Sequence, residues 1–341
     1  MRDRDEVGEG RVAASARRRF ARRAALGLCA LVACAAPVAL ADRAPPPALA
    51  VEEVADGIWL HRGRHEDMGA DNGGDIANLG FVVGEASVAV IDPGASHRIA
   101  RALGAAVAGV TDLPVSHVVL THAHPDHVLG AGAFAGVPEV AAHARLSRAV
   151  AARADAANPR YAFALDPDTP ATLAPTLEIR PGERRTIDLG GRALELIALP
   201  TAHTDNDLAV LDRRTGTLWA GDLAFERRLP SLDGSLLGWL DALDALEALE
   251  PTLVVPGHGA PGPWDAAVGA QRAYLEALAA DVRERLRRGD TLGEVVAEAE
   301  RATAPGARAG GRSAELGRDA ALFALHHPTN VTRAYTELEW E

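Results

Sequence analysis

The chain has 341 residues, of which 48% are hydrophobic and 24% are charged, a composition typical of a globular protein. All 35 basic residues are arginine, which excludes chemistry that needs a lysine amine, such as a Schiff base or a P-loop phosphate contact. The formal net charge is -12. Binding to phosphate depends on clustered positive charge, so we expect no nucleic-acid partner and no attraction to anionic lipid.

Residues 1–41 have the pattern of an export signal. Arg17, Arg18 and Phe20 precede an apolar run from Ala24 to Leu40, and Ala39-Leu40-Ala41 supplies the small residues of a cleavage site. The arginine pair followed by Phe20 resembles the twin-arginine motif, which directs the export of folded proteins. We therefore predict a soluble periplasmic protein.

Three alternatives to this prediction concern the same segment. A membrane anchor is disfavoured because Pro37 breaks the apolar run, which is shorter than the roughly 20 residues of a spanning helix. General secretory export, or a lipoprotein anchored through Cys34, would use a similar leader. Cys29 and Cys34 are the only cysteines, so a chain cleaved after Ala41 has no disulfide and no thiolate nucleophile or metal ligand.

The remainder divides into a linker at 42–51, a main domain at 52–303 and a C-terminal extension at 304–341. The main domain alternates strands and helices, which predicts an α/β fold. Two segments share one plan, in which a hairpin and a helix lead to a strand that ends at histidines. The elements are strands 79–83 and 87–91, helix 97–110 and strand 117–120, then strands 207–211 and 217–220, helix 235–249 and strand 252–255. Open α/β sheets bind ligands just past such strand ends.

The strongest chemical motif follows the first of these strands, in Thr121-His122-Ala123-His124-Pro125-Asp126-His127. Imidazole and carboxylate groups are the ligands of zinc-type divalent sites. On an extended loop His122 and His124 point the same way and can bind one ion. Asp126 and His127 then turn onto the next helix and reach a second ion.

Three further candidate ligands occur in order along the chain. His203 follows the apolar strand at 193–199, Asp222 follows the strand at 218–221, and His258 lies between two glycines after the strand at 253–255. Each of them alone would more often be structural. Together with the first motif they give five histidines and two aspartates just beyond strand ends, which predicts a binuclear metal site.

This order of motifs resembles the metallo-β-lactamase superfamily over about residues 52–300. The resemblance implies a four-layer αββα sandwich built from two pseudo-repeated halves, and two divalent ions, zinc above all. One ion would be bound by His122, His124 and His203, the other by Asp126, His127 and His258, with Asp222 bridging them. Asp92, in Ile91-Asp92-Pro93-Gly94, resembles the family's aspartate that orients ligating groups, although a simple turn would use the same residues.

A finer resemblance is to an exported subgroup, the quinoprotein relay system zinc metallohydrolases and the SoxH-like proteins. It rests on Asn78–Gly84, Leu232–Trp239 and Asn330–Tyr335, whereas residues 158–181 match the subgroup poorly. The resemblance implies a functional link to a periplasmic quinoprotein dehydrogenase, a c-type cytochrome system or a sulfur-oxidation system.

The expected activity is hydrolysis of a small acyl substrate: an ester, thioester, lactone or amide. A hydroxide bridging the two metals would attack the carbonyl carbon, and Asp126 would hold its metal and accept a proton. One alternative is an oxidoreductase like the persulfide dioxygenases, with a single iron. Another is a non-catalytic metal-binding accessory protein. A nuclease is disfavoured by the acidic body and by the absence of lysine.

The other histidines are less informative. His61 and His65 precede a Gly/Asp-rich stretch, Gly69 to Asp75, that we expect to be a surface loop rather than a cover of the site. His143 and the pair His326-His327 are expected to be structural or solvated. The leucines of the segment 239–249 are expected to pack in the core rather than to bind a partner.

Overall fold

The computed structural model describes residues 47–307 and 310–341. The predicted export signal therefore lies outside the described residues, as does the first part of the predicted linker. Within the described part of the chain, no helix has both the length and the apolar character needed to cross a membrane.

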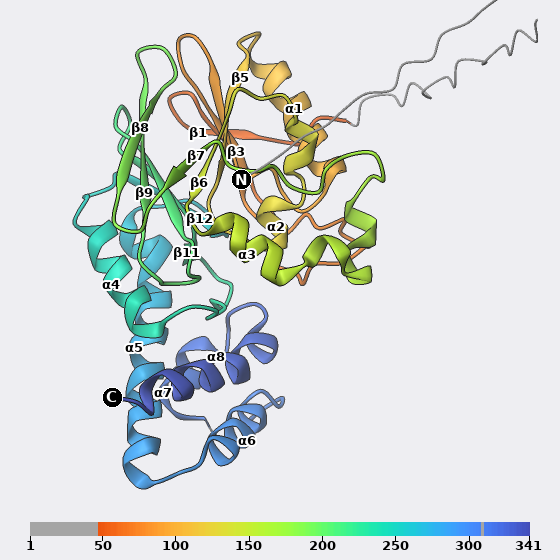
Figure 1. The fold of residues 1–341 in the computed structure, drawn as a ribbon. Coiled ribbons are helices and arrows are strands. Elements are labelled where there is room, and N and C mark those ends of the chain that lie inside the picture. Colours follow the sequence, from red (N-terminus) through yellow and green to blue (C-terminus); the bar gives the residue numbers. More distant parts are fainter. Residues whose placement is uncertain (1–46, 308–309) are drawn as a thin grey trace, which may run out of the picture. The chain divides into compact units, whose positions relative to one another are not determined.

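Two β-sheets form the centre of the fold (Figure 1). The first sheet has seven strands in sequence order, namely β1 (Glu52–Ala55), β2 (Ile58–His61), β3 (Leu79–Val83), β4 (Val88–Ile91), β5 (Val115–Leu120), β6 (Glu139–His143) and β7 (Leu177–Ile179). The second has the order β12-β11-β10-β9-β8, with β8 (Arg184–Asp188), β9 (Ala193–Ala198), β10 (Leu208–Asp212), β11 (Thr217–Phe225) and β12 (Leu253–His258).

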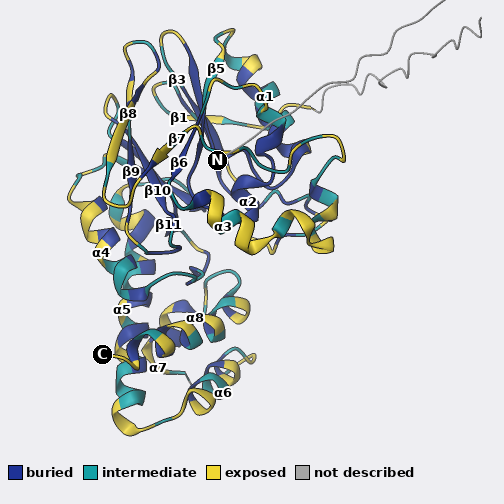
Figure 2. Cartoon of the chain, viewed as in Figure 1, coloured by how far each residue is buried: buried dark blue, intermediate teal, exposed yellow. Residues whose placement is uncertain are grey.

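Three apolar cores define the layers, and they appear as the dark interior of Figure 2. Between the sheets, side chains of both sheets pack together, among them Ile91 and Val255. Helix α1 (His97–Val110) buries its apolar side against the outer face of the first sheet. Helices α4 (Leu236–Glu247) and α5 (Trp264–Arg288) cover the outer face of the second. The predicted four-layer αββα sandwich is confirmed.

The two halves of the sandwich repeat one plan. Strand β3 pairs antiparallel with β4, and the chain then passes through α1 into β5, which is parallel to β4. In the second half β10 pairs antiparallel with β11, and α4 leads into β12, which is parallel to β11. Both connecting helices begin at a serine whose hydroxyl accepts a backbone N–H, Ser96 in α1 and Ser235 in α4.

Two predicted strands are longer than the hydrophobic runs suggested. Strand β11 continues to Phe225 instead of ending at Ala220, and β12 continues to His258. The pairing of these two strands shifts in register at Gly221, which has a φ of +53°. A glycine tolerates this left-handed conformation, so the strand continues through a bulge where the sequence pattern suggested an end.

The remaining secondary-structure elements are helical. They are α2 (Pro125–Val128), α3 (Leu146–Arg153), the 3₁₀ turns Ala131–Phe134, Asp155–Ala157 and Pro159–Ala164, then α6 (Leu292–Ala302), α7 (Gly311–Gly317) and α8 (Phe323–Leu338). Helix α7 begins at Gly311, within the predicted C-terminal extension. The Asp281 carboxylate explains this start, because it accepts hydrogen bonds from the backbone N–H and the hydroxyl of Ser313.

Candidate metal centre

The structure brings all seven predicted ligands together at one end of the two sheets. They come from the loop after β5 and from α2, from the loop between β9 and β10, and from β11 and β12: His122, His124, Asp126, His127, His203, Asp222 and His258. All are buried except His124, which is partly exposed. The side chains form two groups. His122, His124, His203 and Asp222 make up cluster 1, and Asp126, His127 and His258 make up cluster 2.

Asp222 lies between the two clusters and faces both. Its Oδ2 atom is 3.7 Å from His122 Nε2 and 3.6 Å from His203 Nε2. Its Oδ1 atom is 3.1 Å from His127 Nε2 and 3.3 Å from His258 Nε2. Donor atoms around a tetrahedral zinc ion at about 2.0–2.1 Å lie roughly 3.3 Å apart, so both oxygens are placed as ligands of separate ions.

Hydrogen bonds on the far sides of the rings orient the metal-binding nitrogens. His203 Nδ1 donates to the Ser231 carbonyl oxygen at 2.7 Å, and His258 Nδ1 donates to the Ile76 carbonyl oxygen at 2.7 Å. His127 Nδ1 donates to Asp92 Oδ2, also at 2.7 Å. Each bond places the proton on Nδ1 and leaves the lone pair of Nε2 directed at the clusters.

Asp92 supports two ligands at once. Besides His127, it accepts hydrogen bonds from the backbone N–H of Thr121 at 2.8 Å and from its hydroxyl at 2.7 Å. That hydroxyl oxygen lies 3.1 Å from His122 Nδ1 and accepts its proton. Asp92 has a φ of +51°, an uncommon conformation for a residue other than glycine, and such backbone is found where the surroundings require it.

The remaining histidine ligand, His124, is oriented by a carboxylate at the edge of the site. Its Nδ1 atom faces cluster 1, 3.0 Å from His203 Nε2. Its Nε2 atom donates to Asp233 Oδ2 at 3.2 Å, and Asp233 also binds the guanidinium groups of Arg153 and Arg333. Asp233 was not singled out as a site residue, although it stands in the Leu232–Trp239 motif.

The buried polar atoms of the clusters fit divalent cations. The Nε2 atoms of His122, His127 and His258 and the Oδ1 atom of Asp222 are buried without a hydrogen-bond partner in the described part of the chain. Buried polar atoms without partners are costly, and each of these four would be satisfied by a cation. The donor set therefore fits two metal ions.

The charge states of several cluster residues suit metal binding as well. Burial, with the neighbouring His124, lowers the pKa of His203 to about 3. Burial also lowers the pKa of His122 well below its ordinary value. For Asp222 burial opposes ionisation, but the neighbouring His258 and His127 side chains hold its pKa well below the usual range. Neutral imidazole and ionised carboxylate are the forms that bind metals. His127 is the exception: burial opposes its charged form, but the carboxylates of Asp222, Asp126 and Asp92 raise its pKa well above the ordinary value, so a metal ion would displace its proton.

A pocket of about 240 Å³ opens over the clusters and includes His124 and Asp126 in its lining. Three regions outside the predicted ligand motifs contribute to it. Met68 adjoins the Gly/Asp-rich stretch, Tyr161 comes from the 3₁₀ turn at 159–164, and His326 comes from α8. His326 therefore lies at the pocket, because α8 folds back over the site.

Arg228 is the most unusual group in this pocket. The residue is 8% exposed, its Nε atom has no partner, and no carboxylate in residues 47–307 or 310–341 pairs with it. Its Nη1 atom donates to the Glu66 carbonyl oxygen at 3.3 Å and lies 3.2 Å from His258 Nδ1. Sequence reasoning missed Arg228, because nothing in the run Glu226-Arg227-Arg228 distinguishes it from the exposed Arg227.

The other histidines lie outside the clusters. His61 is buried and donates through its ring to Ala50 and Asp75, so it fixes the start and end of the loop before β3, while His65 is exposed. His143 and His327 are fully buried. The predicted core role of the α4 leucines holds for Leu243 and Leu246, which are buried.

The chain matches the model of one protein family. The model of the metallo-β-lactamase superfamily matches residues 72–258, more than half of the chain. The chain belongs to this superfamily. Superfamily membership and the two clusters together support a metal-dependent hydrolase.

Individual proteins resemble this chain in part of the sequence or in the fold. The uncharacterized protein YobT of Bacillus subtilis is 34% identical over 125 residues, which are 34% of this chain and 48% of YobT, so the match spans about half of that relative. The sec-alkylsulfatase Pisa1 from Pseudomonas sp. has a TM-score of 0.61 at 20% identity, covering 85% of this chain and 50% of Pisa1. A metallo-β-lactamase from Hirschia baltica has a TM-score of 0.51 at 18% identity, covering 67% and 97%. At these identities the solved structures establish similarity of fold alone.

Proposed function

We propose that the protein is a binuclear zinc hydrolase that cleaves an ester, thioester, lactone or amide. The observation that carries the proposal is the position of Asp222, whose two carboxylate oxygens face different clusters at 3.1–3.7 Å from four histidine nitrogens. A single-ion site would need only cluster 1. The completeness of cluster 2 therefore favours two ions over the mononuclear iron alternative.

Two divalent ions bound here would acidify water and polarise a carbonyl oxygen. The residues of the chain have separate tasks in such a reaction. Asp222 would hold both ions, one through each carboxylate oxygen, and would offset part of their charge. Asp126 lines the pocket, and its Oδ2 lies 3.4 Å from His258 Nε2, so it can hold an ion and receive a proton on the substrate side. Asp92 and Asp233 keep His127 and His124 in position.

We further propose that the substrate carries an anionic group near the reacting carbonyl. Arg228 supports this because a buried cation without a carboxylate partner is costly, and a substrate anion in the pocket would compensate it. Tyr161 and Arg153 line the same pocket and add polar contacts. The similar structures include a sec-alkylsulfatase and a metallo-β-lactamase, and sulfate esters are anionic.

For the cellular role, we propose an exported protein of the quinoprotein relay or SoxH-like subgroup, linked to a periplasmic quinoprotein or cytochrome system. The leader motif at Arg17 and Arg18 and the motifs at 78–84 and 232–239 support this. Replacement of both arginines by lysine tests the route, because the twin-arginine pathway discriminates between them. Blocked export would support it, and unimpaired export would favour general secretion or the lipoprotein route.

The test of the activity is a screen of the zinc-loaded mature protein. The panel contains matched neutral and anionic esters, thioesters, lactones and amides, together with a persulfide in an oxygen electrode. We expect hydrolysis of at least one acyl class that a chelator abolishes and added zinc restores. Oxygen consumption with the persulfide would instead support the iron enzyme. Two bound ions without any hydrolysis would support a metal-binding accessory protein.

A further inference from the structure

The loop between β2 and β3, residues 62–78, supports one side of the metal centre. The carbonyl oxygen of Ile76 in this loop accepts the hydrogen bond from His258 Nδ1 at 2.7 Å. The carbonyl oxygen of Glu66, also in the loop, accepts from Arg228 Nη1 at 3.3 Å. The loop therefore orients a ligand of cluster 2 and holds the buried cation of the pocket over the metal ligands.

His61, the last residue of β2, connects to both ends of this loop. The residue is 8% exposed, and its Nε2 atom lies 2.7 Å from Asp75 Oδ1 near the end of the loop. Its Nδ1 atom lies 2.9 Å from the Ala50 carbonyl oxygen. Asp75 directly precedes Ile76 in the chain. A shift of Asp75 is therefore transmitted to the carbonyl oxygen that orients His258.

Both ring nitrogens of His61 need a proton in this arrangement. A carbonyl oxygen only accepts hydrogen bonds, so Nδ1 donates to Ala50. With its one proton on Nδ1, a neutral ring would direct the Nε2 lone pair at the Asp75 carboxylate. A contact of 2.7 Å between these two acceptors requires a second proton between them. The geometry thus requires the doubly protonated ring.

The surroundings of His61 favour this charged form. Burial opposes it, but the hydrogen bond and the charge of Asp75, together with the bond to the backbone, outweigh burial and raise the pKa of His61 above the ordinary 6.5. In the described part of the chain no other charge acts on the ring from the neighbouring elements: Arg62 and Glu52 pair with each other, the β3 residue opposite is Leu79, and residues 47–51 are uncharged. The bond to Asp75 is present below the raised pKa and is lost as the pH rises through it.

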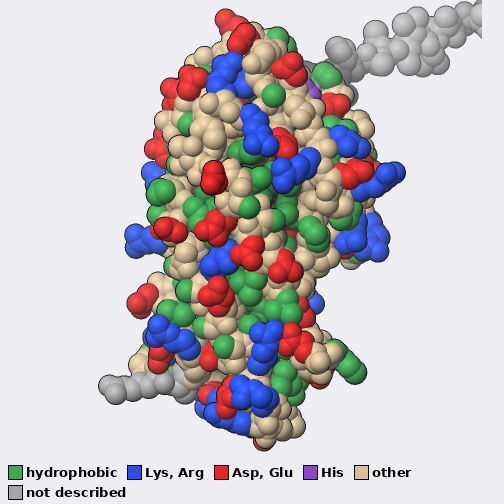
Figure 3. Space-filling model, turned by 90° about the vertical axis from the view of Figure 1, so that its left-hand side faces the viewer, with side chains coloured by type: hydrophobic (Ala, Val, Ile, Leu, Met, Phe, Trp, Pro, Cys, Tyr) green, Lys and Arg blue, Asp and Glu red, His purple; other side chains and the backbone are tan. Residues whose placement is uncertain are grey.

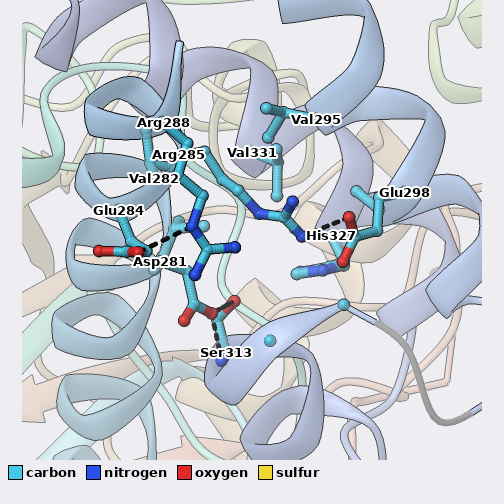
Figure 4. Close-up of a pocket in the computed structure, with 14 residues that line it drawn as sticks. Asp281, Val282, Glu284, Arg285, Arg288, Val295, Glu298, Ser313, His327 and Val331 are labelled. Carbon is cyan, nitrogen blue, oxygen red and sulfur yellow. Dashed lines mark hydrogen bonds and ion pairs between the residues drawn. The ribbon is translucent and has the colours of Figure 1, made fainter. Parts of the chain in front are cut away.

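The ion pairs that arginine forms do not share this property. Figure 3 shows arginine side chains beside carboxylates on one face of the molecule. Figure 4 shows another such pair, Arg285 with Glu298, among the C-terminal helices. Arginine keeps its proton at every pH at which proteins are folded, whereas histidine loses its proton near neutral pH. The pair of His61 and Asp75 therefore responds to pH where the arginine pairs do not.

We propose that protonated His61 is a positioning residue of the metal centre, which holds the loop 62–78 against cluster 2 and releases it when its proton is lost to solvent. With a neutral ring, the Nε2 lone pair and the Asp75 carboxylate repel each other, and the end of the loop that carries Ile76 moves. His258 Nδ1 then loses the acceptor that orients it, so cluster 2 should bind its ion more weakly relative to cluster 1. This inference goes beyond the proposed hydrolysis, because it applies to any chemistry at these ions.

The protonation of His61 is tested by nuclear magnetic resonance of the zinc-loaded mature protein labelled with ¹⁵N-histidine. We expect both ring nitrogens of His61 to carry protons at pH 6, and one of these protons to be lost with a midpoint above 6.5. The midpoint should fall in Asp75→Asn, which removes the carboxylate charge. A midpoint at or below 6.5 in the wild-type protein would overturn the proposal.

The release of the loop is tested by hydrogen exchange of the Asn78 amide, which donates to the Gly257 carbonyl oxygen at 2.8 Å. The exchange rates are corrected for the intrinsic effect of pH. Raising the pH from about one unit below the measured His61 midpoint to about two units above it should lower the protection of this amide at least about tenfold, as expected for the loss of a hydrogen bond to a charged group. Unchanged protection over this range would contradict the release.

Two variants separate the proton of His61 from its other contributions. Asp75→Asn keeps the size of the side chain, and its amide can donate to the Nε2 lone pair of a neutral ring. Its loop protection, and the ratio of the zinc affinities of the two clusters in chelator competition, should therefore be independent of pH over this range. His61→Phe removes both hydrogen bonds of the ring and should lower the protection at every pH.

His117→Phe is the matched control, because His117 in β5 also contacts a carboxylate, with its Nε2 atom 3.3 Å from Glu139 Oε1. This variant should retain the pH dependence of the wild type. A wild-type pH dependence in Asp75→Asn would contradict the role of the His61 proton, and full loop protection in His61→Phe would contradict the role of His61. Should His61→Phe fail to fold, the comparison of Asp75→Asn with the wild type decides the question alone.

Discussion

Gly257 approaches Asp222 so closely that a Cβ atom at position 257 would lie 2.0 Å from Asp222 Oδ1. Non-bonded atoms do not come this close, so any side chain at Gly257 must displace the carboxylate. Strand β12 thus sets the position of the group that faces both clusters. The glycine before His258 is needed for close approach rather than for flexibility.

The first prediction tests this contact. Gly257→Ala should push Asp222 away from its position, lower metal retention and reduce kcat/KM at least tenfold. The matched control is Gly269→Ala in α5, where an added Cβ meets no atom within 4 Å and helix propensity should favour alanine. Metal content and hydrolysis of the best substrate are measured for both. Full metal content and activity in Gly257→Ala would contradict the placement of Asp222.

The second prediction concerns Arg228. Arg228→Gln removes the buried cation and should lower kcat/KM for an anionic substrate by about 10–100-fold, since hydrogen bonds to charged groups are worth about 1.5–3 kcal/mol. Hydrolysis of a neutral analogue should change little. Arg227→Gln, at the exposed neighbouring position, is the control. Equal losses on both substrates would show that Arg228 stabilises the site rather than selecting anions.

The third prediction concerns Asp92. Asp92→Asn keeps the size of the side chain and tolerates the positive φ, but it removes the charge that His127 Nδ1 contacts. The ion of cluster 2 should bind about 10–100-fold more weakly, while cluster 1 changes less, because only Thr121 connects Asp92 to His122. Competition with a chromogenic chelator measures the two affinities. An equal loss of metal affinity at both clusters would contradict the prediction that Asp92 acts mainly on cluster 2.

The fourth prediction concerns pH and stability. Burial holds the pKa of His327 at about 4, below the ordinary value of 6.5, so the unfolded chain binds a proton at a higher pH than the folded one. The stability from this group is complete above pH 6.5 and is lost as the pH falls toward 4. When the pH is lowered from 7 to 5, protonation of His327 in the unfolded chain should therefore reduce the free energy of unfolding by about 2 kcal/mol. Urea unfolding of the zinc-loaded protein should therefore be less pH-dependent in His327→Phe by that amount. An unchanged pH dependence would contradict a buried neutral His327.

Much of the site could be predicted because its ligands follow strands with clear apolar patterns. The motif after β5 places four ligands within six residues, and such local spacing can be read directly from the sequence. The extent of β11 and β12 could not be predicted, because it depends on a bulge at Gly221 that forms only when the two strands pair. Arg228 was missed for a related reason, since burial distinguishes it from Arg227 and burial depends on the fold.

The contribution of α8 to the pocket over the metal ligands could not be predicted either, because it depends on long-range packing. His326 and Thr329 line the pocket over the metal ligands, and Asn330 binds the loop that carries Ser231. These contacts join residues about 100 positions apart, and no local pattern around His326-His327 indicates them. The C-terminal segment therefore belongs to the site in the structure, whereas the sequence suggested only an extension.

The central claim is that Asp222 bridges two metal ions, and metal stoichiometry tests it most directly. Inductively coupled plasma mass spectrometry of the mature protein should give close to two equivalents of zinc per chain for the wild type. His258→Ala, which removes a ligand of cluster 2 only, should retain about one equivalent. Asp222→Asn, which alters both clusters at once, should retain clearly fewer than two. One iron per wild-type chain, or two ions together with full activity in Asp222→Asn, would contradict the account.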